Sequence, residues 1–160
     1  WYVVMGSVAD KNVYVYKNPA DAATANSANS GALVALKMEA PTHVSFSANA
    51  QYILTQNGKA LRVYDIENSR NYGYQLPFPI DAPQEKAVWM DANRITYVSG
   101  GKQVVFDYDN INSRTLVDSS PVYPGRFDRE YKYLYSFTEA GEGSTGSVLS
   151  ATPLRTPSDL

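Results

Sequence analysis

The stretches FSANAQYIL (46–54), WMDANRITY (89–97) and FDREYKYLY (127–135) share one pattern. Each begins on an aromatic residue, passes through polar turn-forming residues and continues into an apolar or aromatic run. The three stretches start 43 and 38 residues apart. A strand, a tight turn and a second strand therefore recur along the chain, and this internal repeat decides how the rest of the sequence is interpreted.

The sequence that follows the second strand repeats as well. Dipeptides that favour two-residue hairpins come next, Asn57-Gly58 in one repeat and Gly100-Gly101 in the following one. They lead into KALRVYDIENSR (59–70) and KQVVFDYDNINSR (102–114), which share a leading lysine, a Val-aromatic-Asp core and a closing Asn-Ser-Arg. A complete repeat therefore predicts four strands, a to d, at 43–47, 52–56, 60–66 and 71–78, with a period of about 42 residues.

Four meandering strands at this period are typical of the blades of a β-propeller, whereas solenoid repeats of similar length are helical. The flanks predict partial repeats, with strands b, c and d in WYVVM (1–5), NVYVY (12–16) and ALVAL (32–36), and strands a, b and c in the last repeat. We expect an all-β fold of about three and a half blades, each a four-stranded antiparallel meander, with three, four, four and three strands. The predicted single domain, 1–160, divides into blades at 1–38, 39–80, 81–120 and 121–160.

The strand count predicts an open arc. The first blade lacks strand a and the last lacks strand d, so the two ends do not complement each other, and exposed apolar blade faces are a condition that natural proteins avoid. We expect the ring to be completed by missing chain or by self-association. Because the chain begins at Trp1, not at methionine, we also expect that an upstream segment has been removed.

Composition restricts the classes of partner. Fourteen basic residues are scattered among sixteen acidic ones, for a net charge of −2, so the phosphate-neutralising contribution to nucleic-acid binding would be weak and no nucleic-acid partner is expected. No apolar run approaches the ~20 residues of a membrane helix, so no direct membrane insertion of this segment is expected. The absence of cysteine excludes disulfides and thiolate metal sites.

Motifs of known chemistry are incomplete. The only histidine, His43, has no G-x-S-x-G nucleophile motif to accompany it, and zinc sites need several His or Cys ligands. A G-x-G-x-x-G pattern at 141–146 joins two predicted strands, whereas the dinucleotide motif joins a strand to a helix. The sequence therefore predicts no catalytic residue, no metal and no cofactor.

Two pairs of carboxylates recur with the repeat. Asp65 and Glu67 in one repeat correspond to Asp107 and Asp109 in the next, at the end of strand c. Because these residues follow the repeat, we expect them to cap the c–d turns and to pair with the arginines that close the two motifs, Arg70 and Arg114.

The stretch VSFSANAQYILTQNGKALRVYDIENSR (44–70) resembles blades of the WD-repeat and TolB-type propellers. It shares with them a hydrophobic-Ser start, a turn, an apolar second strand and a third strand that ends in Val-aromatic-Asp. It lacks the Gly-His and Trp-Asp dipeptides of the WD family. The resemblance implies a scaffold that presents loops to other macromolecules, and for the TolB-like type an extracytoplasmic place in the bacterial envelope or as an exported protein. The cytoplasm is the alternative compartment.

The leading functional hypothesis is a non-enzymatic scaffold that binds a protein or another macromolecule through the d–a and b–c loops, which cluster at one end of the blades. The candidate binding residues in these loops are His43, Asn57, Asp81, Gln84, Gly100 and Tyr123. The alternative is a propeller module of a larger hydrolase or of a transport or envelope assembly, whose active residues lie outside this segment. The low-complexity stretch 19–31 is expected to be a surface loop.

Overall fold

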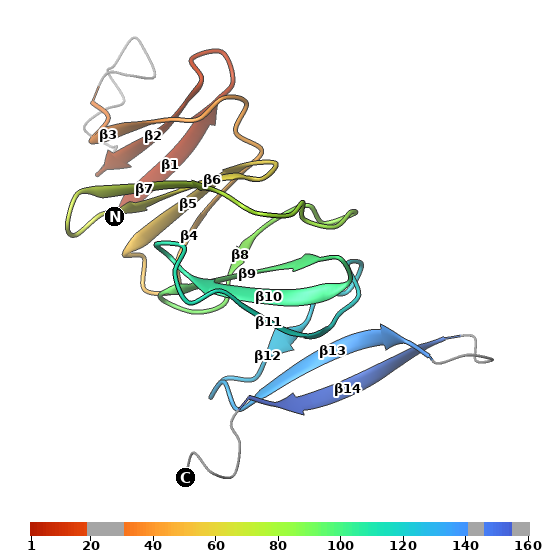
Figure 1. Ribbon diagram of the computed structural model, residues 1–160. Helices are drawn as coiled ribbons and strands as arrows, with labels where there is room; N and C mark the ends of the chain where they lie inside the picture. The colour runs from red at the N-terminus through yellow and green to blue at the C-terminus, as the bar shows by residue number, and fades with distance from the viewer. Residues whose placement is uncertain (19–30, 141–145, 155–160) are drawn as a thin grey trace. The chain divides into compact units, whose positions relative to one another are not determined.

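The computed structural model describes residues 1–18, 31–140 and 146–154, and within these residues it contains fourteen β-strands and no helix (Figure 1). The expected surface loop at 19–31 and the glycine motif at 141–146 lie outside the described residues, apart from Gly31 and Gly146. The strands form four separate antiparallel sheets, and the strand order in each sheet follows the order of the chain. Each sheet is therefore a meander, as the repeat predicts.

The described strands are distributed three, four, four and three among the sheets, which confirms the predicted count. The first sheet comprises β1 (Tyr2–Ser7), β2 (Asn12–Lys17) and β3 (Val34–Lys37), and the second comprises β4 (His43–Phe46), β5 (Tyr52–Asn57), β6 (Ala60–Asp65) and β7 (Arg70–Gln75). The third comprises β8 (Val88–Trp89), β9 (Arg94–Ser99), β10 (Lys102–Asp107) and β11 (Arg114–Asp118), and the fourth comprises β12 (Arg126–Phe127), β13 (Tyr133–Glu139) and β14 (Ser147–Pro153).

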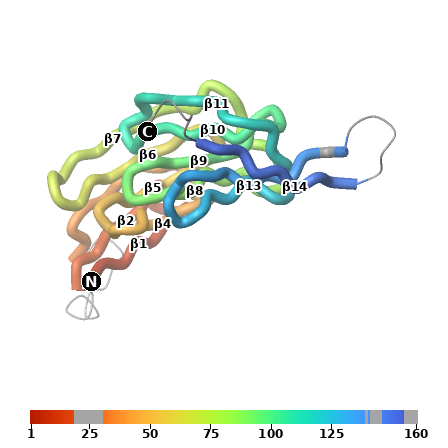
Figure 2. The backbone as a smooth tube through the Cα atoms, turned by 90° about the horizontal axis from the view of Figure 1, so that it is seen from below, coloured from red at the N-terminus to blue at the C-terminus, as the bar shows by residue number. Residues whose placement is uncertain are grey.

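The chain folds into two compact units. Unit 1 contains Trp1–Pro77 and Asp91–Asn93, and unit 2 contains Phe78–Met90 and Arg94–Leu160. The first two sheets therefore belong to unit 1 and the last two to unit 2. Within unit 2, β13 and β14 run side by side as a long hairpin (Figures 1 and 2), paired from Tyr133↔Pro153 to Glu139↔Ser147.

The inner strands of each sheet form the core. In unit 1 the buried cluster is built by β2, β3, β5 and β6, from Val13, Val15, Leu36, Met38, Ile53 and Tyr64. The inner strands β2, β5 and β6 carry runs of consecutive buried residues instead of a strict alternation, as expected for strands that are covered on both faces. In unit 2 the rings of Tyr97 and Phe106 meet edge to face, with centroids 5.8 Å apart. Ile95 and Leu134 are fully buried in the same unit.

The pairing of strands a and b shows that the repeats differ in turn length. Phe46 pairs with Ile53 in unit 1, whereas Trp89 pairs with Ile95 in unit 2. The turn after Trp89 is therefore one residue shorter, and Ile53 corresponds to Ile95, not to Thr96 as the gap-free comparison of the sequences implies. Both isoleucines are fully buried, because side chains on a strand alternate between the two faces and only this register keeps an apolar residue at that position.

The b–c hairpin of unit 1 also differs by one residue from the prediction. Asn57 is the last residue of β5 and pairs with Ala60, so the two-residue loop is Gly58-Lys59 and not Asn57-Gly58. Gly58 alone takes the positive φ, of 53°. In unit 2 the predicted Gly100-Gly101 loop is confirmed, since Ser99 pairs with Lys102 and both glycines have positive φ.

The carboxylates at the ends of β6 and β10 accept hydrogen bonds within the c–d turns, as predicted, but they do not form the predicted ion pairs. Asp65, which is 2% exposed, accepts hydrogen bonds from the backbone N–H groups of Glu67 and Asn68, both at 3.0 Å, so it caps the c–d turn. Asp107 accepts one from the Asn112 amide at 2.6 Å. The expected ion pairs with Arg70 and Arg114 are absent among the described residues. The two carboxylates are instead hydrogen-bonded to donors within their own turns.

Candidate functional site

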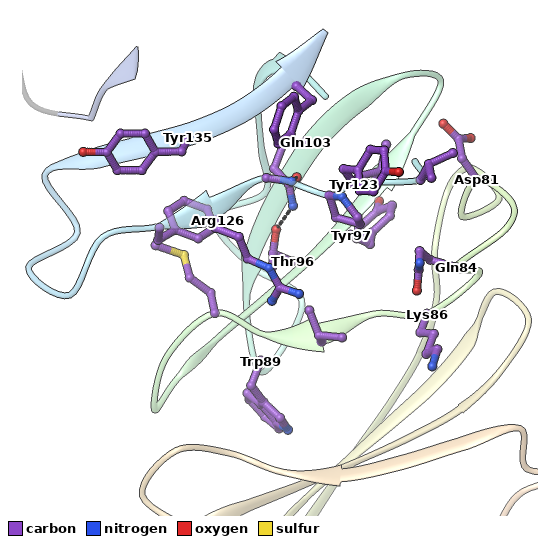
Figure 3. Close-up of a pocket in the computed structure, with 18 of the residues that line it drawn as sticks. Asp81, Gln84, Lys86, Trp89, Thr96, Tyr97, Gln103, Tyr123, Arg126 and Tyr135 are labelled. Carbon is purple, nitrogen blue, oxygen red and sulfur yellow. Dashed lines mark hydrogen bonds between the residues drawn. The ribbon is translucent and has the colours of Figure 1, made fainter. Parts of the chain in front are cut away.

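Unit 2 contains a pocket of about 690 Å³ between its two sheets (Figure 3). The b and c strands of the third sheet, β9 and β10, form its floor. The d–a connections form its rim, at residues 80–89 and 122–126. The volume lies within the roughly 300–1,000 Å³ range typical of ligand sites.

The floor of the pocket is a buried polar network centred on Gln103, which is 1% exposed. Its amide nitrogen donates to Thr96 Oγ1 at 2.5 Å, as Figure 3 shows. Its amide oxygen accepts from Ser119 Oγ at 3.1 Å and from the Gly125 N–H at 2.9 Å. Thr96 in turn donates to the Val104 carbonyl at 2.8 Å. Since each of these groups has a partner, the network ties β9 and β10 to the 119–125 connection without an unsatisfied side chain.

Gly125 is the point at which the connection approaches the sheet most closely. A Cβ atom at this position would lie 2.8 Å from Leu134 Cδ1 and 2.9 Å from Gln103 Oε1. Leu134 is fully buried, so it has little room to move. The absence of a side chain at residue 125 therefore allows the connection that carries Tyr123 to lie against the floor.

The b–c hairpin and the d–a connection meet at Asp81. One carboxylate oxygen of Asp81 accepts from the Gly100 N–H at 3.0 Å, and the other accepts from the Gly101 N–H at 2.7 Å. The Ser99 hydroxyl donates to the Pro79 carbonyl at 2.6 Å. The Asp81 carboxylate thus holds the d–a connection against the backbone amides of the Gly100-Gly101 hairpin at the edge of the pocket.

The same two kinds of loop meet in unit 1. The Asn57 amide donates to the Glu39 carbonyl at 2.7 Å, and the Thr42 N–H donates to the Gln56 carbonyl at 2.8 Å. In each unit a d–a connection is therefore hydrogen-bonded to a b–c hairpin. The d–a and b–c loops therefore lie together, as the candidate binding residues require.

The structure brings some of the predicted site residues together. Asp81, Gln84 and Tyr123 line the pocket, and Gly100 borders it through its bond to Asp81. His43 and Asn57 belong to unit 1: His43 is the first residue of β4 and pairs with Gln56, while Asn57 ends β5. The six candidates therefore form two groups, and only the group in unit 2 lines a pocket.

Lys86, Trp89 and Arg126 also line the pocket and were not predicted as site residues. Figure 3 shows Arg126 entering from one side, with Gln84 and Lys86 on the other and Trp89 below. One signal for Arg126 is present in the repeat. The residue before the aromatic anchor is Ser45, Val88 and Arg126 in the three repeats, so a charge replaces a small or apolar residue only in the last.

Two titratable groups of the pocket have shifted pKa values. Burial raises the pKa of the Tyr97 phenol above its ordinary value of 10.0, because the phenolate would lose its hydration. The pKa of Asp128 lies below its ordinary value of 3.8, chiefly because its carboxylate accepts the Tyr133 N–H at 2.8 Å. At neutral pH Tyr97 is therefore a neutral donor and Asp128 an anion.

The described residues provide no group of three or more His, Cys, Asp or Glu side chains that could hold a metal ion. Over the same part of the chain, no helix has the length and apolar character needed to cross a membrane.

Comparison with known proteins shows the fold. No protein-family model matches the chain, and no curated protein matches it significantly. Three similar solved structures are the N-terminal domain of Nup159 (14% identity, TM-score 0.54), a complex of S. cerevisiae Dbp5 with Nup159, Gle1, IP6 and ADP (15%, 0.55), and Kluyvelomyces marxianus Hsv2 (11%, 0.51). They are matched over 98%, 91% and 96% of this chain and over 42%, 40% and 42% of their own chains.

These neighbours are β-propellers, and together with the four meander sheets they show that the chain has a β-propeller fold. The chain spans about two fifths of the length of the structures that it matches.

Proposed function

We propose that this chain is a non-enzymatic β-propeller scaffold that binds a protein partner through the loops around the pocket of unit 2. The observation that carries the proposal is the convergence of Asp81, Gln84 and Tyr123, from two d–a connections, on one pocket. The solved complex of Dbp5 with Nup159 supports it by analogy, since it pairs a protein partner with a propeller of similar fold. Neither a nucleic acid nor a cofactor is part of the proposal.

Tyr123 is the residue best placed to contact a partner. Its side chain is 61% exposed, and its ring packs against that of Phe137 with centroids 5.7 Å apart. A tyrosine held by one face and exposed on the other offers a large contact area at a low cost in side-chain entropy. Gln84 adds an exposed amide at the same rim. His43 and Asn57 remain a second proposed binding surface, on unit 1.

Photo-crosslinking tests this proposal. With p-benzoylphenylalanine in place of Tyr123, we expect irradiation in the source cells to attach a protein partner to the chain, because the reactive ketone would lie inside the interface. The matched control is Ile111, which is 54% exposed and lies in the same unit. It follows Asp107, the end of β10 that is remote from the Gly100-Gly101 hairpin. A strand of six residues is about 20 Å long, which places the two ends beyond each other's reach. The measurement is the yield and identity of adducts by mass spectrometry.

The alternative proposal is a propeller module of a larger hydrolase or of a transport or envelope assembly. The chain spans only about two fifths of the matched structures, which is compatible with its being one part of a larger protein. In that case the resemblance to WD-repeat or TolB-type propellers would extend to the whole protein. A TolB-type protein would then be located in the bacterial envelope. An adduct between residue 123 and a catalytic domain, rather than a separate binding partner, would favour this alternative.

We also propose that the four sheets are successive blades of one domain, 1–160, with the predicted blade boundaries, and that missing chain or self-association completes the ring. Exposed apolar side chains support this. On β1, Val3 and Met5 are exposed by 37% and 44%, and on the β13–β14 hairpin Tyr133 and Val148 are exposed by 43% and 49%. None of these four residues lines the pocket. Exposed apolar faces are rare on monomeric proteins.

A mass measurement tests ring completion. At micromolar concentration we expect the 17.6 kDa chain to run as dimers or larger species in size-exclusion chromatography with light scattering, because association covers the apolar faces. Val3→Lys and Met5→Lys together, at exposed positions that do not line the pocket, should shift it towards the monomer mass. A monodisperse, stable monomer of the unaltered chain would count against ring completion.

A further inference from the structure

Three positively charged side chains line the pocket of unit 2 and form no ion pair with any described residue. Lys86, Arg126 and Arg129 line it, and the side chains of all three are exposed and make no hydrogen bond or ion pair with any described residue. Elsewhere in the same unit Lys102 is paired with Asp118 at 2.5 Å. Because Asp81 and Asp128 line the same pocket, its lining carries one net positive charge, in a chain whose net charge is −2.

The two carboxylates in the same lining make no ion pair with these cations. Asp81 uses both of its oxygens to bind the Gly100 and Gly101 N–H groups, and Asp128 accepts the Tyr133 N–H. Hydrogen bonds from backbone amides favour the charged form of a carboxylate and hold it in place. The cations on the rim are therefore available to an anionic ligand.

The rest of the lining is mainly aromatic and aliphatic, with a hydrogen-bonded polar pair on the floor. Trp89 and Tyr123 supply apolar surface at the rim, while Thr96 and Gln103 on the floor bind each other. Cations on a rim with aromatic walls fit a ligand that carries several carboxylates and an apolar side chain.

We infer that this pocket binds an acidic peptide segment of the protein partner, an inference that rests on the proposed function and names the chemistry of the partner. The three cations lie on different segments around the pocket, Lys86 before β8, Arg126 in β12 and Arg129 after it. A strand of glutamate or aspartate residues can pair with them in turn, and the planar Arg126 guanidinium suits a two-point contact with a carboxylate. An apolar residue between the acids packs against Trp89 and Tyr123.

Fluorescence of Trp89 tests the inference. The chain contains two tryptophans, so Trp1→Phe leaves Trp89 as the sole tryptophan reporter in the pocket wall. In this background we expect the capped peptide Glu-Glu-Leu-Glu-Glu to change Trp89 emission saturably in 50 mM NaCl. The matched peptides Gln-Gln-Leu-Gln-Gln and Lys-Lys-Leu-Lys-Lys should leave the emission unchanged. Binding should weaken by about tenfold in 500 mM NaCl, because exposed charges are screened by salt.

Charge-removing variants locate the site. Arg126→Gln and Lys86→Gln should each weaken binding of the acidic peptide by about tenfold, the loss expected for a charge-assisted contact. The matched controls Arg70→Gln and Lys59→Gln, at exposed positions of unit 1, should bind as the parent does. Near-ultraviolet circular dichroism confirms that each variant is folded, and isothermal titration calorimetry provides a second binding readout.

Equal binding of the neutral peptide, or acidic-peptide binding that Arg126→Gln and Lys86→Gln leave unchanged, would overturn the inference. So would the absence of any calorimetric and fluorescence response at millimolar peptide. The proposed function would survive these results if residue 123 still crosslinks a partner, so the two claims fail separately.

Discussion

Replacing Gln103 with leucine is expected to lower the free energy of unfolding of unit 2 by about 2–3 kcal/mol, the cost of leaving buried donors and acceptors unmatched. Leucine has nearly the volume of glutamine and occupies the equivalent position in unit 1, where Leu61 pairs with Gln56 as Gln103 pairs with Val98. The substitution therefore removes the hydrogen bonds to Thr96, Ser119 and Gly125 without opening a large cavity.

Urea unfolding followed by Trp89 emission in the Trp1→Phe background measures the effect, since Trp89 belongs to unit 2. Gln75→Leu, an exposed position at the end of β7, is the matched control and should change stability by less than about 0.5 kcal/mol. Thr96→Val combined with Gln103→Leu should cost less than the sum of the two single changes, because they break the same bond. Additive effects, or no loss in Gln103→Leu, would contradict the described network.

Gly125→Ala is expected to destabilise unit 2 by about 2 kcal/mol, within the 1–3 kcal/mol typical of overpacking. The new methyl group would meet Leu134 Cδ1 at 2.8 Å and Gln103 Oε1 at 2.9 Å, and the Tyr135 carbonyl oxygen at 3.4 Å. Leu134 is fully buried and Gln103 is held by its hydrogen bonds, so the connection itself would have to move. Because that connection carries Tyr123, we expect partner binding to weaken as well.

Gly73→Ala is the matched control for this substitution. A Cβ at residue 73 would meet Nη1 of Arg62 at 3.1 Å, which is the far end of a flexible side chain and can turn away. We therefore expect little loss of stability, measured by circular dichroism in urea. A Gly125→Ala variant as stable as the parent would show that the connection does not lie as close to the floor as described.

The sequence was sufficient to predict the architecture because a propeller repeats its local signals. Aromatic anchors, glycine hairpins and Val-aromatic-Asp motifs each specify one turn or strand, and their recurrence predicted four sheets with the observed strand counts. The register in which strands a and b pair was harder to predict from the sequence. A turn one residue shorter after Trp89 moves Ile95 into the place of Ile53, and nothing in the two nonapeptides shows where the deletion lies.

The site was predictable only in part, because a pocket gathers residues that are distant in sequence. Loop position identified Asp81, Gln84 and Tyr123, which line the pocket. It could not show that Asp81 is bound to the Gly100-Gly101 hairpin, nor that Gln103, in a strand of buried residues, is a hydrogen-bonding centre. Those contacts join residues about 20 apart in the chain and depend on how the sheets pack.

The likeness to Nup159 and Hsv2 extends to the fold alone, at 11–15% identity. The proposals for this chain rest on the lining of the pocket in unit 2, with its three unpaired cations and its aromatic rim. Function in propellers lies in such loops and not in the blades that carry them. The claim that matters most is therefore that the rim around Tyr123 contacts a protein.

The comparison of photo-crosslinking at residues 123 and 111 tests this claim most directly. Both positions are more than half exposed and lie in the same unit, so they differ chiefly in distance from the pocket. We predict a defined protein adduct at residue 123, reduced by excess acidic peptide, and none above background at residue 111. Equal adducts at the two positions, or an adduct at residue 111 alone, would contradict the account.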